Sequence, residues 1–576
     1  MELLERYQLD LLLLDLSLGY RDGMQFLEEI SGRLPDTRII ALSDEAHGGY
    51  GARALEMGPI KYSVAQCSAP VRLLAGSICY RPPRRRILDR MAGAIRGCLQ
   101  RISVQGVEPT VKFFLALSAL LGASFSLLQA AEPDLSPSPT VPAVSVPPLN
   151  FQHETLPNGL EVYSVEDHSS PTVAVHVWYH VGSKDDPQRR SGFAHLFEHM
   201  MFKGNEHLSP DAFENLTENI GGENNAFTAP DVTVYHEVVP SNYLNPILWA
   251  EAERMSSLAL NEANFKSERD VVKEEYRQRI QANPYGDFFL DTVKNSYAVH
   301  PYKRPGIGSI EELDASKLAE VRAFHSTFYR PDNATLVVVG DFQPNELQEW
   351  VKKYFGAIKK PAEKLPRVTA KEPPRKEDKR IVKYSSKVPL PAIAITYLAP
   401  SLRSEDAPAL NLADEILSGG DSSRLYQALV YEQQIAQQAS LGADLNQDLG
   451  LLTVRLILAS GKTPADAEKA FNTELNRFLK DGATPEELAK AKNRFLTGKL
   501  MERETNNGKA SALGEAAVLY GDPNRVNTDL AKLQAVTADQ VREAVGRYLT
   551  DKKKVVIEYL PEAMKPAAPA KEAKKS

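Results

Sequence analysis

Two histidines and a glutamate stand close together in the segment SGFAHLFEHMMF, residues 191–202. His195 and His199 are spaced by about one helical turn, and apolar residues recur with a helical period at Phe193, Leu196, Phe197, Met200 and Met201. On a helix, both imidazoles lie on one face and can reach the same metal ion. The spacing therefore predicts a zinc site built on a helix.

Glu198 precedes the second histidine by one residue. At that position it can accept a proton from a metal-bound water without being a ligand, and H-x-x-E-H is a known order in hydrolytic zinc sites. The alternative is a helix whose two surface histidines and glutamate contact one another between turns. The other histidines of this region are interpreted as packing or surface residues: His176, His180, His207, His236, His300 and His325.

A catalytic zinc ion usually has three protein ligands and one open position. The charged segment 261–281, NEANFKSERDVVKEEYRQRIQ, predicts a second helix, on which Glu268 and Glu275 lie two turns apart on one face. Glu275 could be the third ligand while Glu268 orients a histidine or the ligand shell, and Glu274 is the adjacent alternative. Because Lys and Arg alternate with Glu here, spacing alone also allows a solvated acidic helix.

Composition limits the other classes of function. The net charge is -7 and no basic stripe with interleaved aromatic residues is present, which excludes a nucleic-acid partner. The three cysteines are Cys67, Cys79 and Cys98, so a metal site further along the chain must use histidine and carboxylate ligands.

The elements that must position these residues fall into two halves of similar pattern. The first, 150–358, opens on a strand pair and the alternating segment 172–181, TVAVHVWYHV, and the second, 380–560, also opens and closes on strands. A charged, Pro-rich linker, 359–379, separates them. This organisation predicts an α+β fold with two duplicated domains, each an antiparallel-rich sheet packed with helices.

The ends of the chain have a different character. Residues 1–75 resemble a degenerate response-regulator receiver in which the residues for phosphotransfer, apart from Asp15, are missing. The leader continues over 76–131 and ends in the uncharged segment 113–131, for which a cleaved secretory signal, a retained membrane anchor or a buried helix are the alternatives. Residues 132–149 are predicted to be a linker and 561–576 a disordered tail.

Five segments together resemble the pitrilysin and insulinase family of zinc metallopeptidases, most closely the branch of the mitochondrial processing peptidase β subunit and its bacterial relatives. They are GFAHLFEHMMFKG, IGGENNAFTAPDVTVYHEVVP, SERDVVKEEYRQR, HPYKRPGIGS and FYRPDNATLVVVGDF. The resemblance implies an endopeptidase with one Zn²⁺ per chain, Glu275 as third ligand and two domains that form half of a clamshell chamber. It also implies that peptide substrate pairs as an extra β-strand with the segment Asn225, Ala226, Phe227 and Thr228.

The sequence departs from this family in its second half. Active members carry an Arg and a Tyr that hold the substrate backbone, and the equivalent positions here are Val430 and Gln437. The resemblance therefore implies a heterodimer with a related chain that supplies both residues, with a homodimer as the alternative.

Three functions remain to be compared. The leading prediction is a zinc endopeptidase, periplasmic or secreted, with a tether at 113–131 if that segment is retained. The first alternative is a non-catalytic assembly or binding subunit of the same fold. The second is a signalling protein, which the missing phosphotransfer residues of the leader disfavour.

Overall fold

The computed structural model describes residues 146–566 except 551, together with three short strands nearer the N-terminus. The chain divides into two compact units, 1–142 and 143–576, and each is described by itself. In the first unit β1 (Leu11–Asp15), β2 (Arg38–Ser43) and β3 (Tyr62–Gln66) form a parallel sheet in that order. The other predictions for the leader, including the segment 113–131, lie outside the described residues.

The first half of the second unit contains a six-stranded sheet in the order β4-β5-β9-β6-β8-β7. Among these neighbours β5 and β9 pair in parallel and the others are antiparallel. The strands are β4 (Gln152–Thr155), β5 (Glu161–Glu166), β6 (Thr172–Tyr179), β7 (Glu223–Thr228), β8 (Thr233–Pro240) and β9 (Ala334–Gly340). The alternating segment predicted as a strand is β6, and the predicted substrate segment is the edge strand β7.

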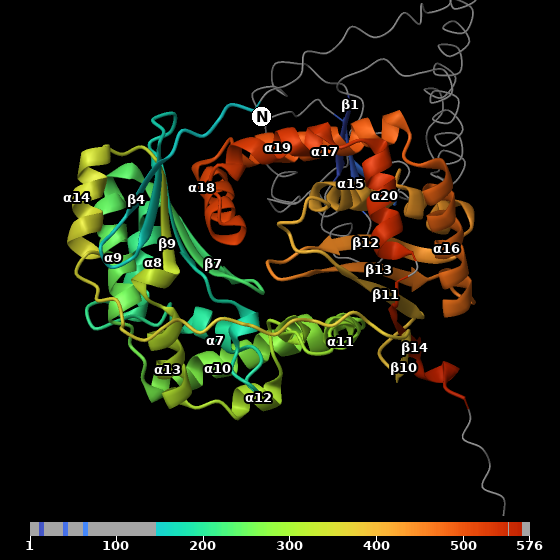
Figure 1. The fold of residues 1–576 in the computed structure, drawn as a ribbon, viewed down its shortest axis with the longest axis horizontal. Coiled ribbons are helices and arrows are strands. Elements are labelled where there is room, and N and C mark those ends of the chain that lie inside the picture. The colour runs from blue at the N-terminus through green and yellow to red at the C-terminus, as the bar shows by residue number, and fades with distance from the viewer. Residues whose placement is uncertain (1–10, 16–37, 44–61, 67–145, 551, 567–576) are drawn as a thin grey trace, which may run out of the picture. The chain divides into compact units, whose positions relative to one another are not determined.

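Helices from the same half pack against this sheet and share one apolar core with it. They are α7 (Phe193–Met200), α8 (Pro210–Thr217), α9 (Leu244–Ser256), α10 (Glu262–Tyr276), α12 (Ile310–Asp314), α13 (Leu318–Phe328) and α14 (Pro344–Tyr354). Figure 1 shows α7 and α10 side by side at one end of this half. The predicted helix 261–281 corresponds to α10 followed by a π-helical turn, Arg277–Gln281.

The second half contains a five-stranded sheet in the order β10-β14-β11-β13-β12. Its strands are β10 (Lys379–Ser385), β11 (Ala392–Ala399), β12 (Ala436–Asp444), β13 (Gly450–Leu458) and β14 (Val555–Pro561). Its helices are α15 (Ala407–Ser418), α16 (Pro464–Asp481), α17 (Pro485–Glu502), α18 (Asn506–Glu515), α19 (Arg525–Ala535) and α20 (Ala538–Leu549). A second apolar core joins most of them to this sheet.

The two halves exchange a helix. The helix α11 (Gly286–Ser296) belongs to the first half by sequence, yet its Phe288 is buried with Ala394 and Ile557 of the second sheet. In return, α18 buries Leu513 against Trp178 and Val337 of the first sheet (Figure 1). Each sheet therefore has one face covered by a helix from the other half.

The predicted α+β fold with two helix-packed sheets is confirmed. The stretch predicted as the linker contains no helix or strand before β10 begins at Lys379. The prediction of a disordered tail from 561 is wrong for the first residues of that segment. Pro561 still pairs with Ser385 at the end of β14, and Glu562–Met564 forms a 3-10 turn. Among the described residues, no helix is long and apolar enough to span a membrane.

Candidate metal centre

The start of α7 is fixed by several hydrogen bonds. The buried carboxylate of Asp186 accepts hydrogen bonds from the backbone N–H groups of Gly192 and Ala194, both at 2.8 Å. These N–H groups belong to the helix start, where the backbone has no partner within the helix. Gly192 has a φ of 86°, and a Cβ there would lie 2.7 Å from the carbonyl oxygen of Ile307. The position therefore requires glycine, and the helix start is held on two sides.

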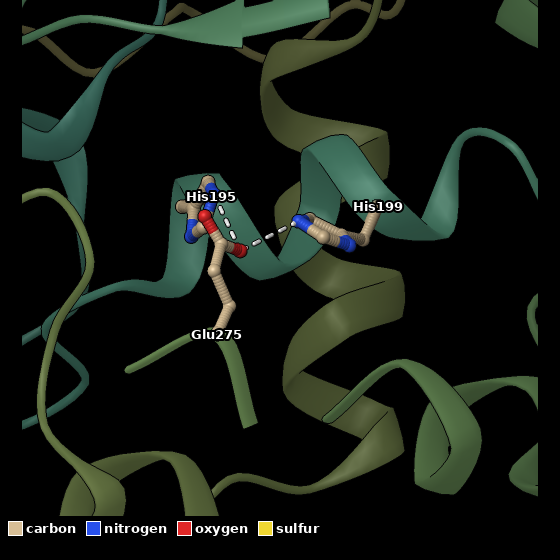
Figure 2. Close-up of side chains that lie close together, drawn as sticks. All are labelled: His195, His199 and Glu275. Atoms are coloured by element: carbon tan, nitrogen blue, oxygen red, sulfur yellow. Dashed lines mark ion pairs between the residues drawn. The ribbon is translucent and has the colours of Figure 1, made fainter. Parts of the chain in front are cut away.

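The structure brings His195, His199 and Glu275 together (Figure 2). Glu275 Oε2 lies 3.6 Å from His195 Nε2 and 3.4 Å from His199 Nε2, and the three ligand atoms all lie within 4.8 Å of one another. Bonds of about 2.0 Å in a tetrahedral zinc site place two ligand atoms about 3.3 Å apart. The donor set and the two distances from Glu275 therefore fit a zinc ion.

The two histidine rings have different surroundings. Burial lowers the pKa of His195 to about 3, so this ring is neutral and can donate a nitrogen lone pair to a metal. For His199, burial lowers the pKa, but the neighbouring carboxylates, Glu268 first, outweigh it and the net pKa is raised. A metal ion would compete with that proton for the ring.

Glu268 lies where an orienting residue is expected. Its side chain is 5% exposed, and its Oε2 lies 3.7 Å from His199 Nδ1, the ring nitrogen that faces away from Glu275. Its other oxygen pairs with Lys203 Nζ at 2.9 Å. Such a carboxylate can fix the orientation of a ligating imidazole.

Glu198 lies beside the three candidate ligands and is almost fully buried. Thr228 Oγ1 donates a hydrogen bond of 2.5 Å to Glu198 Oε2. Burial raises the pKa of Glu198, and the hydrogen bond from Thr228 opposes that shift. Sequence reasoning assigned Thr228 to the substrate strand and missed this contact with the predicted base.

A cavity of about 740 Å³ joins these groups to the edge strand. The four predicted substrate-binding residues, Asn225, Ala226, Phe227 and Thr228, line it together with His195, His199, Glu198 and Glu275. Within the described residues, β7 has a strand partner, β8, on one side only, so its other edge is free to accept a peptide strand. The side chain of Asn225 accepts a hydrogen bond from the backbone N–H of Ala226.

Arg279 is a further polar residue of the cavity that sequence reasoning missed. Its guanidinium lies 2.8 Å from Glu275 Oε1, the oxygen that does not face the histidines. Glu274, the alternative ligand, instead pairs with Arg277 at 3.0 Å and is more than half exposed. The i,i+4 spacing of Glu275 and Arg279 was visible in the sequence, but it is common on any charged helix.

The other predicted positions lie elsewhere. Val430 is part of a π-helical turn, Tyr426–Glu432, and Gln437 lies at a bulge where β12 shifts its register on β13. Neither lines the cavity at the candidate metal centre. Two of the histidines set aside as packing residues connect the halves, because His176 pairs with Asn507 and His180 with Gln447, each at 2.7 Å.

Two family models match successive parts of this chain. The family model described as insulinase, peptidase family M16, matches residues 161–305, and the one described as the peptidase M16 inactive domain matches residues 317–495. A zinc protease of Helicobacter pylori, PqqE, is 34% identical over 348 residues, which cover 59% of this chain and 78% of that protein.

Two solved structures have a similar fold. One is a protease from Helicobacter pylori, with a TM-score of 0.68 at 28% sequence identity. The match covers 72% of this chain and 99% of the Helicobacter pylori chain. The periplasmic protease PqqL from Escherichia coli has a TM-score of 0.59 at 19% identity, and this chain covers 50% of it.

Proposed function

This chain belongs to the insulinase family of peptidases, M16, and from that premise we propose that it is a zinc-dependent endopeptidase. In the proposal His195, His199 and Glu275 hold one Zn²⁺, and Glu198 is the general base. One observation carries the proposal: the three candidate ligands and Glu198 line the same cavity as a free sheet edge.

The proposed chemistry divides between the ion and the side chains. A zinc ion held at this site would acidify a water molecule and polarise the carbonyl of the scissile peptide. Glu198 takes a proton from the attacking water and delivers it to the leaving amine, which requires an ionised carboxylate at the start of the reaction. Thr228 favours that ionised form because its hydroxyl donates a hydrogen bond to Glu198 Oε2.

Substrate is proposed to add to β7 as an extended strand. Main-chain hydrogen bonds along a sheet edge recognise any peptide, and the neighbouring side chains then select its sequence. The side chain of Asn225 covers the N–H of Ala226 and must move aside if a substrate carbonyl is to use that donor. We therefore propose an unfolded or extended peptide as the substrate class.

A partner subunit is the second part of the proposal. The positions equivalent to the family's substrate-holding Arg and Tyr are Val430 and Gln437, so this chain lacks those two contacts. It also covers only half of the larger PqqL chain. These observations support a heterodimer with a related chain that supplies Arg and Tyr, and a homodimer is the alternative.

The location is proposed from the sequence. The uncharged segment 113–131 resembles a secretory signal, which supports a periplasmic or secreted enzyme. The name of PqqL describes that relative as periplasmic. N-terminal sequencing of the native protein tests this proposal, because a signal cleaved near 131 leaves a mature chain that begins there.

The deciding experiment combines metal analysis with a peptidase assay. We expect about one zinc ion per purified chain and hydrolysis of a fluorogenic peptide when a related chain with the Arg and Tyr pair is added. Zinc binding without hydrolysis under either condition would favour the non-catalytic subunit of the same fold. A chain that binds no zinc would contradict both the metal site and the proposed peptidase.

A further inference from the structure

A second cavity, of about 300 Å³, lies in the second half of the protein between α15, α17, α18 and α19. Its wall joins two separate apolar cores. Leu533 belongs to the core of the second sheet, whereas Ala512 and Val526 belong to the core that α18 forms with the first sheet. Its volume is at the lower end of the range for small-molecule sites in proteins.

The cationic side chains that line this cavity already have partners. Lys499 pairs with Glu502 at 2.6 Å, and Arg525 pairs with Asp529 at 2.7 Å. Arg503 donates a hydrogen bond of 2.9 Å to the carbonyl oxygen of Pro147. Lys499 and Arg525 therefore have carboxylate partners, whereas Arg503, among the described residues, contacts only backbone carbonyl oxygens and its Nε has no partner.

Three polar side chains of the wall remain without a partner. Within residues 146–566, apart from 551, no hydrogen bond or ion pair reaches the carboxylate of Glu515, the hydroxyl of Tyr520 or the amide of Asn411. Burial raises the pKa of Glu515, and the nearby cations Lys499 and Arg525 oppose that shift. A half-buried carboxylate without a partner costs free energy, which a bound cation would recover.

The local backbone places two of these groups together. The chain leaves α18 through a π-helical turn, Ala516–Tyr520, with Glu515 as its N-cap. A π-turn is closed by hydrogen bonds between residues five apart, so Glu515 and Tyr520 are separated by little more than one turn, and both line the cavity. Turns of this kind occur often at functional sites.

We propose that this cavity binds a small primary amine with an apolar body. The ammonium group pairs with Glu515, and its three N–H donors match the acceptors of Glu515, Tyr520 and Asn411. The carbon chain packs against Phe495 and Leu533. A divalent metal ion is disfavoured because it requires several anionic ligands, and Glu515 is the one carboxylate of the wall without a partner cation.

The test uses the full chain and two probes of equal length, hexylamine and hexanol, with binding measured by isothermal titration calorimetry. We expect hexylamine to bind more tightly than hexanol. Glu515→Gln should weaken hexylamine about tenfold and leave hexanol unchanged, because the variant removes a charge and keeps the shape. Glu504→Gln is the matched control, since this nearby carboxylate is exposed and does not line the cavity.

Two further measurements distinguish binding in this cavity from an effect of misfolding and from binding at the candidate metal centre. Ala516→Leu should fill the cavity and abolish binding of both probes while the near-UV circular dichroism spectrum stays native. Removal of metal with a chelator should leave hexylamine binding unchanged, so this proposal can fail separately from the proposed peptidase. Equal affinity for the two probes, equal weakening in both carboxylate variants, or unchanged binding in Ala516→Leu would overturn the proposal.

Discussion

The role of Glu198 can be tested by a change of one atom. We expect Glu198→Gln to abolish peptide hydrolysis while zinc stays bound, because a neutral amide cannot take the proton from the attacking water. Peptide hydrolysis and zinc content are measured on the same preparation. Turnover close to that of the wild type would contradict the proposed role.

The third ligand can be assigned by comparing two adjacent residues. Glu275→Gln should lower the zinc affinity by at least about tenfold, because two histidines alone hold zinc weakly. Glu274→Gln is the matched control, since Glu274 pairs with Arg277 and is not one of the three clustered ligand residues, and this variant should retain its zinc. Competition with a chromophoric chelator measures the zinc affinity of both variants. Loss of zinc in Glu274→Gln but not in Glu275→Gln would show that Glu274 is the third ligand.

The hydrogen bond from Thr228 to Glu198 predicts a change in the pH profile. This bond stabilises the ionised carboxylate, so Thr228→Val should raise the pKa of Glu198 further. Because the base must be ionised, the acid limb of kcat/KM should move to higher pH, by about one unit for a bond to a charged group. Thr228→Ser keeps the donor and should leave the limb in place.

Much of the candidate site could be predicted at this scale because its residues are local on two helices. Spacing alone places His195, His199 and Glu198 on one helix, whereas Glu275 required the family resemblance as well. The contact of Thr228 could not be predicted, because it depends on how β7 approaches the metal centre and no spacing in the sequence encodes that approach. The contact of Arg279 with Glu275 has an i,i+4 spacing, but this spacing is too common on charged helices to single it out.

At the scale of the element, the cap of α7 should control both stability and metal binding. Asp186→Ala leaves two N–H groups at the helix start without an acceptor and should lower the free energy of unfolding by about 2 kcal/mol. Zinc affinity should fall as well, because α7 positions both histidines. Thermal unfolding and chelator competition measure the two effects.

Thr537→Ala provides the control for that prediction. It removes the hydrogen bond that the backbone N–H of Gln540 donates to Thr537 Oγ1 at the start of α20, a helix that packs in the core of the second half. Stability should fall by about 1 kcal/mol without a change in zinc affinity. If both variants changed zinc affinity equally, the effect of Asp186 would be general destabilisation.

Helices and strands whose apolar residues recur with a regular period could be predicted from the sequence, whereas irregular backbone could not. The alternation of TVAVHVWY and the apolar period of FAHLFEHM predicted β6 and α7. The predicted helix over 261–281 instead ends its regular part at Tyr276, and a π-helical turn completes it. The extra residue of such a turn has no side-chain signature, so the sequence could not separate it from the helix.

At the scale of the whole molecule, the need for a partner can be tested by adding one. We expect the isolated protein to hydrolyse peptides weakly, and a related chain that carries the Arg and Tyr to raise kcat/KM by about tenfold or more, because positioning contributes several kcal/mol to catalysis. A fluorogenic peptide assay with the mass measured in solution tests this. Addition of the same partner to Glu198→Gln should give no activity, and full activity of the isolated monomer or homodimer would contradict the need for a partner.

The duplication of the two halves was predictable from their repeated pattern, but their exchange of helices was not. Phe288 of α11 and Leu513 of α18 are ordinary apolar residues on amphipathic helices. A hydrophobic stripe predicts burial without specifying which sheet provides the partner surface. Only the three-dimensional connections assign each helix to the opposite half.

The order of synthesis gives this exchange a kinetic consequence. An inner strand of the second sheet, β14, and the helix that covers the first sheet, α18, both come late in the chain. Before α18 and β14 have been synthesised, β11 lacks its neighbouring strand β14. The face of the first sheet that α18 covers in the folded protein is then exposed to solvent. Nascent chains of this protein therefore expose apolar surface until synthesis is nearly complete, and they should depend on holding chaperones during that interval.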